Sequence, residues 1–348
     1  MTARPTEAQV LADIEGDILA ECEAPTESQA TPRLPWLTGS ELAAMTPEAP
    51  DYVAAPYVAR GIITQLSAKV KAGKTRLALE IVRGVLTGKG FLGHPSTYTA
   101  VAYLTEESPA SFGPAVDLAG IAGRDDFHVL CRHFCGAAHW PPTVEAVRAY
   151  VREHDIGFVV VDTADVWMLE PGDDPNDSVV AEAAVRELQC LAGDGVAILL
   201  LRHERKSGGD ISDSARGSSA FAGAVDALLS LQRMSGAETR RELECIARAA
   251  LADAPAKIVI ELEDGHYVSR GDAGDVAQAD TRRKLLDVLP ASRETAQALD
   301  ELAEASGVGR TTLHHTLTRL VNDGTACREK GAGSAAARGF GYWMSETL

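Results

Sequence analysis

The chain has 348 residues, 45% of them hydrophobic, so it is long and apolar enough for one large and one small domain with buried cores. Its formal net charge of −17 argues against a surface-wide attraction to nucleic-acid phosphates, so any contact with DNA must be local. It lacks a run of eighteen apolar residues, and its N-terminus has acids where a signal peptide is basic and then apolar. We therefore expect a cytoplasmic protein with no membrane segment.

Residues 1–34 are rich in Ala, Glu, Pro and Thr, a composition that predicts a mostly mobile acidic arm. Within the arm, apolar residues at helical spacing indicate a short amphipathic helix: Val10, Leu11, Ile14, Ile18 and Leu19. This helix could pack on its own domain or dock on a neighbouring subunit, and the pattern leaves both alternatives open.

Residues 35–267 form the predicted large domain, in which short apolar runs alternate with helical patterns. The runs are residues 61–67, 100–105, 127–131, 156–163, 196–203, 226–233, 242–249 and 257–263. Short, nearly continuous runs separated by helices predict an α/β fold whose parallel sheet is covered on both faces. The last strands are candidates for antiparallel pairing.

A phosphate-binding loop is indicated by the segment SAKVKAGKT, residues 67–75. It matches the pattern G-x-x-x-x-G-K-[ST] except that Ala68 stands at the first glycine, and an apolar run precedes it while a helical pattern follows. Ala68 would obstruct the loop only if that position required a positive φ. We therefore predict a working ATP site.

In such a loop, backbone N–H groups and the N-terminus of the following helix face the phosphates. Lys74 would reach the β- and γ-phosphate oxygens, and the Thr75 hydroxyl would bind Mg²⁺. The predicted cofactor-binding residues are Ala68, Lys69, Val70, Lys71, Ala72, Gly73, Lys74, Thr75 and Arg76.

Acidic residues follow two of the predicted strands at their carboxyl ends, where open α/β sheets bind ligands. Asp162 ends the run FVVVD and is predicted to hold Mg²⁺ together with Thr75; the alternative is an aspartate that merely caps its strand. Glu106 and Glu107 end the run YLTEE, and one of them could orient the attacking water as a general base. The pair is also typical of a helix N-terminus.

A second cluster, in FHVLCRHFCGAAHW, has a composition that could suit a metal: His128, Cys131, His133, Cys135 and His139. Its spacing lacks the paired knuckles of zinc modules, so we favour a buried strand that continues into a loop. The six cysteines are scattered in a chain that needs no covalent staples, which favours reduced thiols.

The order of the motifs GIITQLSAKVKAGKT, VAYLTEES, VVVDT, LLLRHERK and DSARGSSAFAGAVDALLSL resembles the RecA-like ATPases of the RepA and DnaB hexameric-helicase group, especially its AAA_25 branch. The resemblance covers about residues 36–267. It implies a RecA-like parallel-sheet P-loop ATPase core that works as a homo-oligomer, a hexamer in this group. It also implies that Glu106, rather than Glu107, is the catalytic glutamate.

The same resemblance gives roles to residues later in the domain. His203 would sense the γ-phosphate, and Arg248 would be the arginine finger offered to a neighbouring subunit. Residues 204–216 would line the central channel, where Arg205, Lys206 and Arg216 would touch the phosphates of single-stranded DNA. The alternative for His203, Arg205, Lys206 and Arg216 is that they are simply solvated residues of the surface.

The C-terminal part begins with a polar, glycine-containing stretch, residues 268–280, which we interpret as a linker. Residues 281–348 then predict a helix, a turn at Gly307–Gly309, a second helix from about residue 310 to 321, and a β-hairpin. This order resembles a small winged helix-turn-helix domain. The predicted DNA-facing residues of the second helix are Arg310, Thr311, Thr312, His314, His315 and Arg319.

Two limits apply to this tail. It holds nine Lys and Arg against eight Asp and Glu, so few cations are available to neutralise duplex DNA. Many winged helices bind protein, and that alternative stays open.

The hypothesis for the whole chain is a Mg²⁺-ATP-hydrolysing DNA motor, a RepA-type replicative helicase of a plasmid, phage or mobile element. The alternatives are an ATP-switched DNA-binding regulator or initiation factor, or a degenerate ATPase scaffold.

Overall fold

The computed structural model describes residues 36–136, 138–170, 172–174, 177–204, 220–248, 251, 253–335 and 339–345. The chain divides into two units, Met1–Glu48 and Ala49–Leu348. The described part of the first unit contains helix α2 (Gly39–Met45), which Thr38 and Glu41 cap reciprocally. The predicted helix around residues 10–19 lies outside the described residues.

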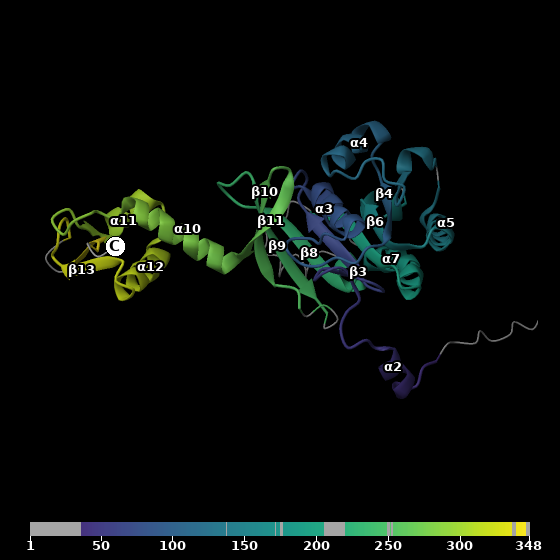
Figure 1. Ribbon diagram of the computed structural model, residues 1–348, viewed down its shortest axis with the longest axis horizontal. Coiled ribbons are helices and arrows are strands. Elements are labelled where there is room, and N and C mark those ends of the chain that lie inside the picture. Colours follow the sequence, from purple (N-terminus) through teal and green to yellow (C-terminus); the bar gives the residue numbers. More distant parts are fainter. Residues whose placement is uncertain are drawn as a thin grey trace, which may run out of the picture. The chain divides into compact units, whose positions relative to one another are not determined.

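The second unit contains a nine-stranded sheet with helices on both of its faces (Figure 1). Its order is β11-β10-β9-β8-β3-β7-β6-β4-β5. The strands are β3 (Ile63–Ala68), β4 (Ala100–Thr105), β5 (Phe127–Cys131), β6 (Ile156–Asp162), β7 (Ala197–His203), β8 (Ala227–Arg233), β9 (Arg240–Ala247), β10 (Lys257–Glu263) and β11 (His266–Asp272). A separate two-stranded sheet pairs β1 (Tyr52–Ala54) with β2 (Val58–Ala59).

The predicted α/β architecture is confirmed, because all eight apolar runs are strands of this sheet. Strands β8, β3, β7, β6, β4 and β5 are parallel, whereas β9, β10 and β11 pair antiparallel. The carboxyl ends of the parallel strands therefore meet at one edge of the sheet. The register places Ala68 opposite His203 and Thr105 opposite Asp162 at that edge.

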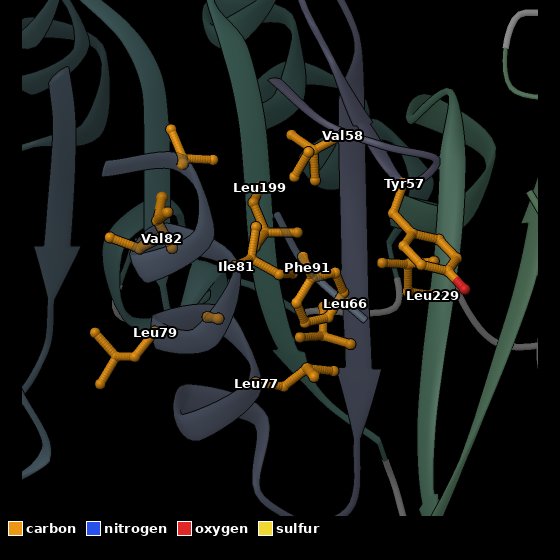
Figure 2. Packing of buried hydrophobic residues seen from close by; sticks show 14 of the residues in the cluster. Tyr57, Val58, Leu66, Leu77, Leu79, Ile81, Val82, Phe91, Leu199 and Leu229 are labelled. Atoms are coloured by element: carbon orange, nitrogen blue, oxygen red, sulfur yellow. The ribbon is translucent and has the colours of Figure 1, made fainter. Parts of the chain in front are cut away.

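Two hydrophobic clusters cover the two faces of the sheet. On β3, Leu66 belongs to one cluster and Ile63 to the other, as the alternation of side chains along a strand requires. Figure 2 shows Leu77 and Ile81 of α3 pointing toward Leu66 and toward Leu199 of β7. The helices of this unit before the C-terminal part are α3 (Lys74–Thr87), α4 (Pro109–Leu118), α5 (Trp140–Glu153), α6 (Ala164–Met168), α7 (Ser178–Gly193) and α9 (Ala220–Ala224), with a 3₁₀ turn at Arg132–Phe134.

The stretch interpreted as a linker, residues 268–280, is instead ordered secondary structure. Strand β11 continues to Asp272, and helix α10 (Ala273–Val288) begins at the next residue. The Asp272 side chain accepts hydrogen bonds from the backbone N–H groups of Gly274 and Asp275 and so caps the helix. The linker prediction is wrong because the polar and glycine residues that suggested it form a helix start.

The C-terminal elements follow the predicted order of helix, turn, helix and hairpin. Helix α11 (Leu299–Ser306) ends at Gly307, which has a φ of 66°, and α12 (Arg310–Asn322) follows. Strands β13 (Ala326–Lys330) and β14 (Phe340–Met344) form the hairpin, and β12 (Gln297–Ala298) adds a third strand. The core of this part contains Leu285, Leu289, Leu302, Leu313, Leu317, Leu320, Ala326 and Tyr342.

The histidine- and cysteine-rich segment behaves as a strand and a loop. His128 and Cys131 lie on β5, and His139 precedes α5 and contacts Glu170. Within the described part of the chain, His, Cys, Asp and Glu side chains do not form a group of three or more that could hold a metal.

His128 lies on the edge strand β5, beside a tyrosine and a second histidine. Its Nδ1 atom is 3.0 Å from the Tyr150 hydroxyl, and its ring lies against His154. Burial, and then the charge of His154, lower the pKa of His128, while Asp126 acts in the opposite direction. The unfolded chain therefore binds more protons than the folded chain just below neutral pH, and stability falls as the pH falls through this window.

We expect His128→Asn to flatten this loss of stability between about pH 7.5 and 5.5, because asparagine stays neutral throughout. Urea unfolding of wild type and variant across this range measures the effect, with the exposed His94→Asn as control. If His128→Asn and wild type lose stability in parallel, the assignment to His128 is wrong.

Candidate functional site

Ala68, which stands at the first glycine of the motif, does not obstruct the loop between β3 and α3. Ala68 is the last residue of β3, is fully buried, and pairs with His203 and Leu231. It is not among the described residues with positive φ, so its methyl group causes no backbone strain. Positive φ values occur instead at Lys71 (63°) and Gly73 (109°). The loop residue that adopts a left-handed conformation without being a glycine is therefore Lys71, which the sequence did not reveal.

Lys74 is the first residue of α3, and its side chain reaches the carboxyl ends of the strands. Its Nζ atom lies 2.7 Å from Nδ1 of His203 and donates to the Ala68 carbonyl oxygen at 3.4 Å. Burial lowers the pKa of Lys74, while the charges of Asp162 and Glu106 act against this change. Burial and the nearby Lys74 charge also lower the pKa of His203. The structure thus brings both predicted residues together.

Asp162 joins the loop to the next part of the site. Its Oδ2 atom accepts hydrogen bonds from the Thr75 hydroxyl at 2.8 Å and from the Tyr103 hydroxyl at 2.7 Å. Burial raises the pKa of Asp162, although these two hydrogen bonds lower it. Tyr103 lies inside the apolar run of β4, where its position is that of a core residue, so no sequence signal pointed to this role.

The two adjacent glutamates occupy different positions. Glu106 accepts a hydrogen bond from the Thr163 hydroxyl at 2.7 Å, and its backbone N–H donates to the Asp162 carbonyl oxygen at 2.8 Å. The Glu107 carboxylate instead accepts a hydrogen bond from the Ser111 hydroxyl in α4. Only the Glu106 carboxylate is tied to the segment that carries Asp162.

The oxygen atoms of Thr75 and Asp162 suit a magnesium ion. Mg²⁺ prefers oxygen ligands and is usually held by one or two carboxylates together with substrate phosphates. A hydroxyl and a carboxylate that is only 4% exposed lie within hydrogen-bond distance of each other here. The residues present therefore fit Mg²⁺.

Other predicted site residues lie elsewhere. The Arg76 guanidinium donates to the Gly265 carbonyl oxygen in the turn between β10 and β11. Val70 and Lys69 are exposed in the loop. Arg205, Lys206 and Arg216 lie outside the described residues.

Arg248 is not brought to the site of its own chain. Strand β9 runs antiparallel to β8, so Arg248 follows the end of β9 that lies beside the amino end of β3. There its guanidinium contacts Asp226 at 3.5 Å, and Asp226 in turn accepts from the Ile63 N–H. A contact with a neighbouring subunit stays a prediction.

The AAA_25 family model, described as an AAA domain, matches residues 25–209, just over half of the chain. The chain belongs to this family. The match, together with the phosphate-binding loop on a central strand of a mostly parallel sheet, identifies a RecA-like P-loop ATPase fold. Among the helices of the described residues, none is both long and apolar enough to cross a membrane.

A comparison with curated proteins found no match. Among solved structures, the chain is similar to the crystal structure of the RadB recombinase, at 15% sequence identity and a TM-score of 0.44. The alignment covers 62% of this chain and 93% of the RadB chain.

Proposed function

We propose that this AAA_25 protein binds Mg²⁺-ATP at the loop of residues 68–75 and hydrolyses it as a DNA motor. The observation that carries the proposal is the contact between Thr75 and Asp162, since it joins the phosphate-binding loop after β3 to an acid at the end of β6, with β7 between the two strands. Lys74 and Glu106 lie at the same edge of the sheet, and each exerts a charge effect on Asp162. This is the set of groups that phosphoryl transfer from ATP requires.

In the proposed reaction, Lys74 leaves His203 and meets the γ-phosphate, whose negative charge competes with the neutral imidazole for the ammonium group. Glu106 accepts a proton from the attacking water. The water oxygen bonds to the γ-phosphorus while the bond to the ADP oxygen breaks. Two hydrogen bonds hold Glu106 in place: its carboxylate accepts one from the Thr163 hydroxyl, and its backbone N–H donates one to the Asp162 carbonyl oxygen.

Thr75 and Asp162 are the residues that would hold Mg²⁺, which supplies neutralisation of charge on the β- and γ-phosphate oxygens when it is bound. His203 would then be free to contact the γ-phosphate and to report its presence to the segment that follows β7. This sensing role rests on the short distance between His203 and Lys74.

We further propose that the C-terminal elements form a winged helix whose α12 faces DNA. Three helices and a three-stranded antiparallel sheet support this assignment. The six residues predicted to face DNA are all exposed. Arg310 pairs with Asp300 at 3.0 Å, but both side chains are 69% exposed. DNA phosphates can therefore replace Asp300 as the partner of Arg310 at little cost in free energy.

We also propose that the chain forms a homo-hexameric ring with single-stranded DNA in its channel, and that it has a RepA-type role in replicating a plasmid, phage or mobile element. Both proposals are supported by the order of the motifs and by the AAA_25 family match. Arg248 would act on the site of the next subunit in such a ring, which is consistent with its position away from its own site.

The test is ATP hydrolysis by wild type and by Lys74→Ala, each without DNA, with single-stranded DNA and with duplex DNA. We expect single strands to raise turnover several-fold and Lys74→Ala to lower it by about 100-fold or more, because a buried charge that stabilises the transferred phosphoryl group is lost. Slow turnover that ignores DNA would favour the ATP-switched regulator. A folded wild type with no turnover at all would refute the ATPase.

A further inference from the structure

The outer side of the phosphate-binding loop is held by side chains from the antiparallel half of the sheet. Arg233, the last residue of β8, donates a hydrogen bond to the Lys71 carbonyl oxygen. Arg241 of β9 donates from Nε to the Ala72 carbonyl oxygen at 2.8 Å. The next residue, Gly73, faces Tyr267 of β11, whose hydroxyl lies 2.7 Å from the place that a Cβ atom on Gly73 would take.

Burial and hydrogen bonds hold the Arg241 side chain in one position. Its side chain is buried at 6% exposure, and its Nη1 atom donates to the carbonyl oxygens of Glu238 and Arg240 at 2.6 and 2.8 Å. Within the described residues, no carboxylate lies within ion-pairing distance of this guanidinium. Among those residues, the Arg241 guanidinium therefore bonds only to carbonyl oxygens. It restrains the loop through the Ala72 carbonyl group and places a positive charge beside the phosphate-binding segment.

The loop needs this support because Lys71 has a left-handed backbone, with a φ of 63°. Residues other than glycine adopt this conformation at an energetic cost, and they keep it only where surrounding contacts impose it. The carbonyl groups of Lys71 and Ala72 are the groups that the two arginines bind. Their hydrogen bonds fix the Lys71–Ala72 and Ala72–Gly73 peptide planes, and the Ala72 N–H donates to the Lys69 carbonyl oxygen at 3.1 Å within the loop.

We propose that Arg241, assisted by Arg233, is a positioning residue for the nucleotide, which holds the strained Lys71–Gly73 segment in its phosphate-binding conformation. This inference rests on the proposed binding of ATP. It assigns to the late strands β8 and β9 a part in nucleotide affinity that no sequence motif indicates.

The test compares ADP and ATP dissociation constants, and KM and kcat for ATP, in wild type, Arg241→Ala and Arg241→Lys. Losing a hydrogen bond to a charged group should raise Kd and KM by about tenfold in Arg241→Ala. Because Arg241 does not touch the reacting atoms, kcat should change by less than about threefold. The lysine variant keeps the charge but has no planar fork, so it should fall between the other two.

The matched control is Arg240→Ala, the neighbouring residue on β9, whose side chain binds Glu261 and Asp280 instead of the loop. It should bind nucleotide as wild type does. Lys71→Gly supplies the decisive arm, since glycine adopts a φ of 63° without strain. Added to Arg241→Ala, it should restore a large part of the lost affinity, which a general loss of stability would not allow.

If Arg241→Ala fails to fold, Arg233→Ala replaces it, because Arg233 is exposed and its removal leaves no buried cavity. Wild-type affinity in folded Arg241→Ala, or no recovery on adding Lys71→Gly, would overturn the inference while leaving ATP binding intact. A wild type that binds neither ADP nor ATP would overturn the proposed function and this inference together.

Discussion

Glu106→Gln is expected to slow ATP hydrolysis by about 100-fold or more while ATP still binds, because glutamine cannot take the proton from the attacking water. Its amide is close in size to the carboxylate and can still accept the hydrogen bond from Thr163, so the site should keep its shape. Steady-state hydrolysis and a separate measurement of the ATP dissociation constant distinguish lost chemistry from lost binding.

Glu107→Gln is the matched control, since the same change is made one residue away. The Glu107 carboxylate bonds to Ser111 at the start of α4, so its loss should lower turnover by no more than about threefold. The opposite ranking of the two variants would transfer the role of general base to Glu107. Equal, small effects would mean that neither glutamate acts in the reaction.

Gly73→Ala is expected to weaken nucleotide binding by about tenfold or more, for two separate reasons. At a φ of 109° an alanine adds backbone strain of about 1–2 kcal/mol. In addition, the new Cβ atom would lie 2.7 Å from the Tyr267 hydroxyl, which is closer than such atoms can approach. Fluorescence titration with a labelled ADP measures the change in dissociation constant.

Two further variants separate these causes. Tyr267→Phe removes the hydroxyl and leaves the rest of the ring at an ordinary contact distance, so Gly73→Ala combined with Tyr267→Phe should recover the steric part of the loss only. Ala68→Gly tests the other end of the motif: it should cost about 0.5–1 kcal/mol of stability as a glycine in a strand, with nucleotide binding retained. Tighter binding by Ala68→Gly would show that the alanine does impair the site.

Local patterns in the sequence account for most of the secondary structure. Each of the eight apolar runs is a strand, because buried strands must carry apolar side chains along their whole length. The stripe of Leu313, Leu317 and Leu320 likewise predicts the buried face of α12. The prediction failed at residues 268–280, where Asp272 and the glycine after Ala273 mark a helix start rather than a loop.

The candidate site was only partly predictable. Lys74, Thr75, Asp162 and His203 could be named because each stands at the end of a strand or the start of a helix, where polar residues interrupt an apolar pattern. Glu106 and Glu107 have the same local pattern, and their tertiary contacts separate them, since Glu106 bonds to Thr163 and Asp162 whereas Glu107 bonds to Ser111. The contacts of Glu106 join the residue after β4 to the end of β6, which is far away in the sequence.

By itself, the sequence determined the eight apolar strands, that a phosphate-binding loop follows β3, and that acids stand at the carboxyl ends of β4 and β6. The tertiary structure alone decided that Tyr103 binds Asp162, that Lys71 takes the left-handed conformation, that Arg233 and Arg241 hold the loop, and that Arg248 lies at the opposite end of the sheet. The physical reason is how far apart in the sequence the interacting residues lie. Burial along one element leaves a periodic trace in its own residues, whereas strand order and direction bring together side chains from distant segments and leave no such trace.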